Sequence, residues 1–309
     1  MDKMEWLKCL ISHKLFKTKK KNRTVINGKN VMSIEEANTY IYDRIIEGKP
    51  LMVCRFGSTE LRLLSDVEAK KIGLKWWVDQ RRWNDLNKYS GFFPKDIVYA
   101  EKFADIYFKL LGEVDLLAVW NNVHEDYMHK KYAPSADLTI LRSLEPWYNS
   151  GCPWTYALQG KKVLVIHPFA DTIQQQYKKR EFLFEDDRVL PEFELKTFKA
   201  VQTLADMTDA RFETWFDALE YMYQESKKID YDIAILGCGA YGLPLAAMIK
   251  ADGKQAIHMG GATQLLFGIK GNRWDTHPVI SKLYNDYWVR PGENETFKKS
   301  DSIENGCYW

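Results

Sequence analysis

The chain has 309 residues, of which 46% are hydrophobic, 14% aromatic and 28% charged, and its net charge is only +2. That length is enough for one large α/β domain or two small ones, and the near-neutral charge lacks the basic footprint of nucleic-acid-binding proteins, so no nucleic-acid partner is expected. The five cysteines are scattered without a CxxC pair, which argues against a disulfide framework or structural zinc and fits a reducing cytosol.

Residues 1–32 form an N-terminal segment with a composition of its own. Apolar side chains recur there at helical spacing, and a basic tract follows at Lys17, Lys19, Lys20, Lys21 and Arg23. An amphipathic helix followed by lysines is typical of contact with an anionic membrane surface. A helix packed on the body of the protein, followed by a solvated linker, explains the same pattern. The segment contains neither a signal peptide nor a membrane span, so we expect a cytoplasmic protein, with peripheral membrane contact as the open alternative.

The pattern becomes regular from Ser33, which is placed to cap a helix that ends at Gly48. Short, mostly apolar runs typical of buried strands lie at 51–56, 116–120, 162–167, 232–236 and 255–259. Helical patterns lie between them at 101–111, 172–184, 214–227 and 243–251. This alternation predicts an α/β fold with a mainly parallel sheet and helices on both faces. We expect one domain over 33–290, with a tryptophan-rich insertion or lid near 73–94 and a polar tail over 291–309.

Ligands of open parallel sheets bind at the carboxyl ends of the strands, so the loops that follow the strands are candidate binding sites. The segment from Gly237 through Gly239 and Tyr241 to Gly242 has the Gly-x-Gly-x-x-Gly spacing between a strand and a helix. Such a turn lets backbone N–H groups and the helix dipole approach a phosphate. A turn chosen only for close helix–strand packing would have the same sequence.

The next strand ends at His258, and the residues that follow are Gly260, Gly261, Thr263 and Gln264. A dinucleotide site needs an acid at this strand end for the adenosine ribose, and the sequence has none there. The glycines and neutral hydrogen-bonding groups suit a nucleotide base, a ribose or a sugar better. His258 can equally be a core histidine with satisfied hydrogen bonds.

Charged residues follow the first predicted strand. Arg55 precedes Gly57, Ser58, Thr59 and Glu60, and burying an arginine at a strand end is costly unless it is paired. Contact with a diphosphate would offset that cost and give the arginine a role in binding. An internal Arg55–Glu60 pair would also offset it, but would only fix the shape of the turn. His167, at the end of another strand, is a candidate general base or phosphate ligand, and Arg273 lies in a polar turn from which it could reach a phosphate.

Two of these segments resemble a known family. The run from Arg55 to Glu60 resembles the Arg-x-Gly-Asp-Gly-Glu signature of GT-D type bacterial glycosyltransferases. The stretch 237–246, followed by 255–260, is similar to that family's strand, glycine turn, helix and glycine-ended strand. The resemblance covers roughly 33–275 in order and spacing, and it implies a single Rossmann-like domain that moves a sugar from a nucleotide donor to a growing glycan with a divalent metal.

The resemblance also suggests a metal site, with one departure from the family. The Asp-x-Glu metal motif falls on 58–60, where Glu60 matches the second acid and Ser58 replaces the first. A serine hydroxyl is a weaker ligand than a carboxylate for Mn²⁺ or Mg²⁺. The family pattern therefore implies Glu60 and Ser58 as metal ligands, and the missing acid weakens that implication.

The leading hypothesis is therefore a glycosyltransferase with a nucleotide-diphosphate sugar donor, UDP-sugar favoured. Its acceptor would be a glycan or a lipid-linked carrier in cell-surface polysaccharide or glycoprotein glycan biosynthesis. Arg55, Glu60 and His167 are the expected catalytic residues, and the glycine loops with Thr263 and Gln264 are expected to hold the donor. An NAD(P)-dependent oxidoreductase and a non-catalytic nucleotide-binding module of a polysaccharide assembly complex are the alternatives.

Overall fold

The computed structural model describes residues 2–16, 23–205, 207–296 and 306–309. The basic tract at Lys17, Lys19, Lys20 and Lys21 lies outside this described part, and so do residues 297–305 of the predicted tail. Among the described residues, no helix combines the length and the apolar character needed to cross a membrane.

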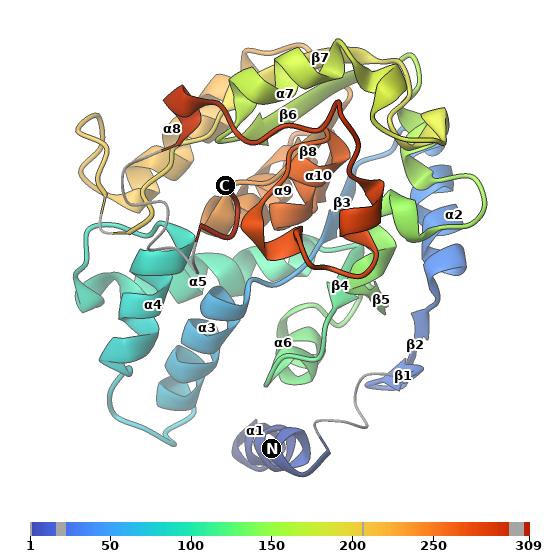
Figure 1. The fold of residues 1–309 in the computed structure, drawn as a ribbon. Coiled ribbons are helices and arrows are strands. Elements are labelled where there is room, and N and C mark those ends of the chain that lie inside the picture. Colours follow the sequence, from blue (N-terminus) through green and yellow to red (C-terminus); the bar gives the residue numbers. More distant parts are fainter. Residues whose placement is uncertain (1, 17–22, 206, 297–305) are drawn as a thin grey trace.

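A mostly parallel sheet runs through the middle of the molecule (Figure 1). Its strands are β1 (Val25–Ile26), β2 (Lys29–Met32), β3 (Leu51–Cys54), β4 (Leu116–Val119), β5 (Asp137–Ile140), β6 (Lys162–His167), β7 (Glu194–Lys199), β8 (Ile233–Leu236) and β9 (Gln255–His258). In the described residues they form a 9-stranded sheet in the order β1-β2-β5-β4-β3-β9-β8-β6-β7. β1 pairs antiparallel with β2, and the other pairs are parallel. The carboxyl ends of β2 to β9 therefore lie along one edge.

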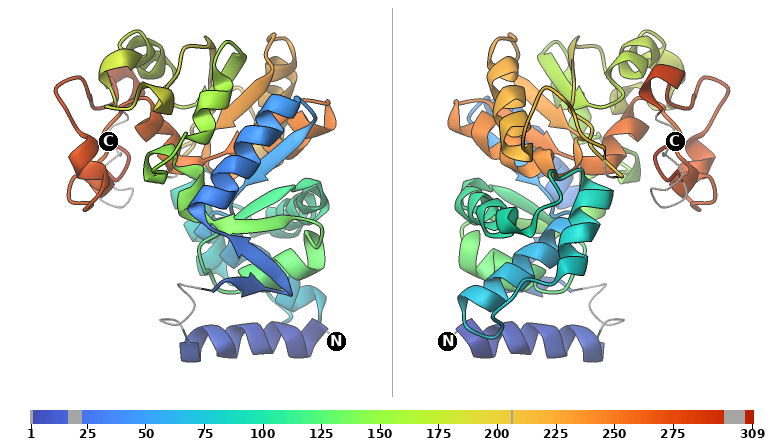
Figure 2. Two further views of the ribbon diagram at one scale, coloured as in Figure 1. Left: turned by 90° about the vertical axis from the view of Figure 1, so that its right-hand side faces the viewer. Right: turned by 90° about the vertical axis from the view of Figure 1, so that its left-hand side faces the viewer.

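Helices cover both faces of the sheet (Figure 2). They are α2 (Ile34–Glu47), α3 (Ser58–Lys71), α4 (Gln80–Ser90), α5 (Ala100–Leu110), α6 (Glu125–Tyr132), α7 (Ala170–Tyr177), α8 (Trp215–Lys227), α9 (Gly242–Ala251) and the short α10 (Thr263–Leu266). A further helix, α1 (Asp2–Phe16), packs against α6 at one end of the molecule. Successive strand residues point to opposite faces, so Met52 and Cys54 join the core under α3, α5, α8 and α9. Leu51 and Val53 join the opposite core, under α2, α7 and α10. The predicted α/β class with two covered faces is confirmed.

The predicted helix start at Ser33 is confirmed in detail. The Ser33 hydroxyl accepts a hydrogen bond from the Glu36 N–H, and the Glu36 carboxylate accepts one from the Ser33 N–H, which satisfies two N–H groups of the first turn. The helix ends at Gly48, whose φ of 68° is in the left-handed region that favours glycine.

The predicted helix over 172–184 is too long, because α7 ends at Tyr177 and short turns follow. Side chains from the C-terminal region bind carbonyls of these turns. The Trp288 Nε1–H donates to the Leu183 carbonyl at 2.8 Å, and the Asn285 amide donates to the Phe182 carbonyl at 2.9 Å. These tertiary contacts hold the turns that follow α7, and no local sequence pattern marks them.

The tryptophan-rich segment near 73–94 is not a simple lid. It contains α4, whose Trp83 is fully buried in the core beside Phe92. Trp76 and Trp77 lie in the α3–α4 connection and are 86% and 54% exposed. The tryptophan side chains of this segment therefore lie partly in the core and partly on the outer surface.

Candidate active site

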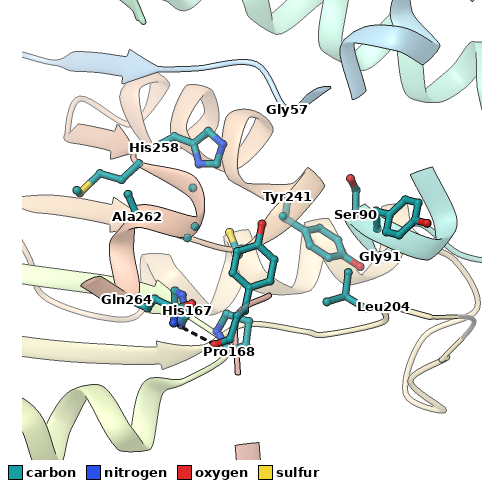
Figure 3. A pocket seen from close by; sticks show the side chains of 18 of the residues that line it. Gly57, Ser90, Gly91, His167, Pro168, Leu204, Tyr241, His258, Ala262 and Gln264 are labelled. Carbon is teal, nitrogen blue, oxygen red and sulfur yellow. Dashed lines mark hydrogen bonds between the residues drawn. The ribbon is translucent and has the colours of Figure 1, made fainter. Parts of the chain in front are cut away.

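A cleft of about 530 Å³ opens at the carboxyl edge of the sheet (Figure 3). Each strand from β3 to β9 contributes to it, through Arg55, Trp120, Leu141, His167, Val201, Gly237 and Met259 in that order. The first turn of α3, the end of α4 and the C-terminal residues Tyr308 and Trp309 close its sides. The sheet thus brings together loops that are up to about two hundred residues apart, as expected for a parallel α/β fold.

Arg55 lines the cleft, is half-buried, and has one N–H group that lacks an acceptor. Its Cζ is 5.1 Å from the centroid of the Trp120 ring, and its Nε is buried without a hydrogen-bond partner. Arg55 and Glu60 form no ion pair among the residues that the structure describes, so the purely internal role considered for Arg55 is absent. A buried guanidinium N–H without an acceptor is costly, and an anionic ligand would supply the acceptor.

Glu60 occupies the first turn of α3, where the positive end of the helix dipole favours a carboxylate. It is 5% exposed, and its Oε2 accepts a hydrogen bond from the Thr59 hydroxyl at 2.9 Å. A Cβ added to Gly57 would lie 1.7 Å from the same Oε2, so only glycine leaves room for the carboxylate. The Thr59 hydroxyl also contacts the Ser90 hydroxyl. Gly57, Ser58, Thr59 and Glu60 all line the cleft, as predicted.

The glycine turn after β8 has two different roles. Gly237, Gly239 and Tyr241 line the cleft, whereas Gly242 does not. A Cβ on Gly242 would come within 2.2 Å of the His258 imidazole, so this glycine is required for packing against the histidine. The packing explanation therefore holds for Gly242, and the ligand explanation remains for the turn that precedes it.

Both histidines at the cleft are uncharged at neutral pH. Burial lowers the pKa of His167 to about 3, and burial together with the positive charge of Arg55 lowers the pKa of His258 to about 3. His167 Nδ1 accepts a hydrogen bond from the Phe169 N–H at 2.9 Å, so the proton of the neutral ring lies on Nε2. His167 is thus suited to donate a hydrogen bond to a ligand oxygen rather than to act as a general base.

Thr263 and Gln264 direct their side-chain hydrogen bonds to backbone carbonyls of the protein. Thr263 is fully buried outside the cleft lining, and its hydroxyl donates to the Leu236 carbonyl at 3.2 Å. The Gln264 amide donates to the carbonyls of Lys270 and Tyr308, each at 3.0 Å. Gln264 therefore holds the C-terminal residues against the cleft that it lines, beside Gly260 and Gly261.

Several cleft residues were missed by sequence reasoning. Glu145 lines the cleft, and burial raises its pKa to about 7. Tyr308 and Trp309 return to the cleft from the end of the chain, where Arg273 lies 4.8 Å from the Tyr308 ring centroid. No local pattern marks Glu145, Tyr308 or Trp309, whereas Arg273, which the sequence analysis singled out, also lines the cleft.

Comparisons with known proteins find similarity to two solved structures. No protein-family model matches this chain, and no curated protein matches it. One similar solved structure is described as "The highly conserved domain of unknown function 1792 has a distinct glycosyltransferase fold", with 15% identity and a TM-score of 0.41 over 75% of this chain and 78% of that one. A selenomethionine-substituted structure of domain of unknown function 1792 has 13% identity and a TM-score of 0.45 over 86% of this chain and 92% of that one.

The cleft fits a metal that binds together with a diphosphate better than a metal held by protein alone. The described residues contain no group of three or more His, Cys, Asp or Glu side chains that could hold an ion. Glu60 supplies a carboxylate and Ser58 a hydroxyl at the same loop. Mg²⁺ often takes only one or two protein carboxylates and completes its shell with substrate phosphates and water.

Proposed function

We propose that the cleft binds the diphosphate of a nucleotide-linked sugar and that the protein is a glycosyltransferase. The observation that carries the proposal is the buried Arg55 Nε without a partner. Around it, residues of the first turn of α3 and of the turn before α9 line the cleft. Two helix N-termini and an arginine are the groups expected around a diphosphate.

The proposed reaction assigns a role to each polar side chain. The acceptor hydroxyl attacks the anomeric carbon of the sugar, the bond from that carbon to the phosphate oxygen breaks, and the nucleoside diphosphate leaves. Arg55 and the Nε2–H of His167 stabilise the negative charge that develops on the departing diphosphate. Glu145 takes the proton of the acceptor hydroxyl, since a carboxyl with a pKa of about 7 is half ionised near neutral pH.

In this proposal, Glu60 and Ser58 are the ligands that Mn²⁺ or Mg²⁺ would use when bound with the donor. A divalent metal there would offset further charge on the leaving diphosphate. Glu60→Gln should therefore lower the benefit of Mn²⁺ for nucleotide binding, with metal-free binding near normal. Equal Mn²⁺ dependence in the wild type and the variant would remove Glu60 from the metal site.

The walls of the cleft suit a sugar acceptor. Trp120, Trp274, Tyr308 and Trp309 line it with aromatic surface, and aromatic rings combine apolar area with a polar edge. We propose a UDP-sugar donor and a glycan or lipid-linked acceptor in the synthesis of cell-surface polysaccharide or glycoprotein glycans. The site of action would be the cytoplasm, with peripheral contact to the membrane.

A nicotinamide dinucleotide is a poorer ligand for the cleft. Its adenosine ribose would need an acid at the tip of β9, where His258 and Met259 lie instead. Titration calorimetry with UDP, GDP, CMP and NAD, each with and without Mn²⁺, tests the proposal. We expect a nucleoside diphosphate to bind more tightly than NAD, and a preference for NAD would overturn the glycosyltransferase assignment.

A further inference from the structure

The helix α1 has an inner face that is fixed to the protein. The Lys131 ammonium pairs with the Asp2 carboxylate at 2.9 Å, and Lys130 pairs with Glu5. The Trp6 ring stacks on the His124 ring with centroids 4.1 Å apart. Both acids of the first turn are therefore turned toward α6 and neutralised there.

The outer face of α1 is apolar and basic. Met4, Leu7 and Ile11 are 62%, 41% and 54% exposed, and their spacing places them on one side of the helix. Lys3 and Lys8 lie on the same exposed side. α1 thus presents apolar side chains and ammonium groups to solvent, while its carboxylates face the protein.

The exposed tryptophans of the α3–α4 connection lie next to this face. A Cβ on Gly73 would be 3.3 Å from the Lys3 Nζ, which places the connection beside the start of α1. Figures 1 and 2 show α1 along the same end of the molecule as this connection. Trp76 and Trp77 are 86% and 54% exposed, and the Lys75 Nζ lies 5.6 Å from the Trp77 ring centroid. We call the surface of Lys3, Met4, Leu7, Lys8, Ile11, Trp76 and Trp77 the α1–Trp76 face.

We propose that the α1–Trp76 face docks the protein on an anionic lipid bilayer. Tryptophan favours the interface between headgroups and acyl chains, and apolar helix residues insert at the same depth. Lysines between them would meet anionic headgroups. The acids of α1 pair with Lys130 and Lys131 of the protein, so the lysines of this face leave it cationic, and a cationic apolar face is complementary to anionic lipid.

Docking at this face would set the cleft at a fixed height above the bilayer. α3 begins at the cleft with Ser58 and ends at Lys71, close to the α1–Trp76 face. Its 14 residues span about 21 Å at 1.5 Å per residue. The docking proposal itself rests on exposure and charge and does not depend on the sugar-transfer reaction.

Co-sedimentation of the full chain with phosphatidylcholine vesicles, with and without phosphatidylglycerol, tests the proposal. We expect binding to the anionic vesicles that weakens as salt is raised. Trp76→Ala/Trp77→Ala should lower the partition coefficient by about tenfold or more, because two large apolar side chains no longer insert. Leu7→Gln/Ile11→Gln should act in the same direction.

The matched control is Phe182→Ala/Tyr287→Ala, which removes another exposed and stacked aromatic pair, 52% and 43% exposed, far from α1 in the sequence. This control should bind vesicles like the wild type, and thermal unfolding should show that all variants fold. The proposal would be overturned if the wild type does not bind anionic vesicles, or if the tryptophan variant binds them as well as the control does. So would a dimer in sedimentation velocity that Leu7→Gln/Ile11→Gln dissociates, since the face would then be a protein interface.

Discussion

The variant Arg55→Lys tests whether Arg55, which lines the cleft, contributes to ligand binding or to folding. Lysine keeps the positive charge but loses the planar fork that binds two phosphate oxygens together. A hydrogen bond to a charged group contributes about 1.5 to 3 kcal/mol, so donor affinity should fall by about tenfold to 150-fold. Stability should change little, because Arg55 forms no ion pair within the described residues and a lysine keeps a cation for the Trp120 ring.

Titration calorimetry with UDP, paired with thermal unfolding of the same samples, measures both effects. Arg62→Lys is the control, since Arg62 is exposed on the same helix that begins at the cleft. Unchanged affinity in Arg55→Lys would refute the role of Arg55 as a diphosphate ligand. A weaker affinity that comes with an equally large drop in melting temperature would also refute it, since the arginine would then act through folding.

Three further predictions follow from burial and steric contacts. The pKa values of His167 and His258 fall from 6.5 to about 3 through burial, so the unfolded chain binds more protons between these values and stability is lost as pH falls through them. Denaturant titrations at several pH values measure how the free energy of unfolding depends on pH. In His258→Gln this dependence should be less steep than in the wild type by up to about 1.4 kcal/mol per pH unit, and a slope equal to that of the wild type would contradict the prediction. Burial raises the pKa of Glu145 to about 7, so turnover should rise with pH through that value. Glu145→Gln should abolish this rise while nucleotide affinity stays normal, and a rise that persists would exclude Glu145 as the base. Gly242→Ala should lower the free energy of unfolding by about 1 to 3 kcal/mol through overpacking, because its Cβ would lie 2.2 Å from the His258 ring. Gly112→Ala, with nothing within 4 Å of the added Cβ, is its control, and equal stability of the two variants would show that the site adjusts freely.

The central strands were predictable because a parallel sheet buries them on both faces. β3, β4, β8 and β9 are buried at every residue. The first three are short apolar runs, and β9 combines two apolar residues with Gln255 and His258. β7 has exposed or half-buried residues throughout, so it carries no continuous apolar signal. A strand could be predicted from the sequence when both of its sides are buried, because only then does it read as an apolar run.

α3 shows why a long helix can escape prediction. It buries Asp66 and Glu68 beside its apolar residues, which breaks the helical apolar period. The Glu68 carboxylate accepts hydrogen bonds from the Tyr127 hydroxyl and from Lys131 at 2.7 Å, so its burial depends on residues about sixty positions away. Charged residues that are buried through distant partners cannot be recognised from local sequence.

The candidate site was predictable where a strand leads directly into a loop. Arg55, Glu60, His167 and Gly237 all reach the cleft, since their positions follow from the strands that precede them. Tyr308 reaches it only through tertiary contacts such as the hydrogen bond from the Gln264 amide to its carbonyl. The sequence therefore locates the cleft residues that directly follow a strand, and the three-dimensional fold is needed to find those that come from the end of the chain.

The most direct test of the donor-site proposal is a crystal structure of the protein with UDP and Mn²⁺. The account predicts density for the diphosphate in the cleft, with phosphate oxygens bound by Arg55 and by the backbone N–H groups of Cys238 and Gly239, since the Gly237 N–H already donates to the Ile166 carbonyl at 3.0 Å. It also predicts an anomalous manganese peak between the diphosphate and Glu60. A nucleotide bound outside the cleft, or a diphosphate in the cleft that does not contact Arg55, would contradict the central claim.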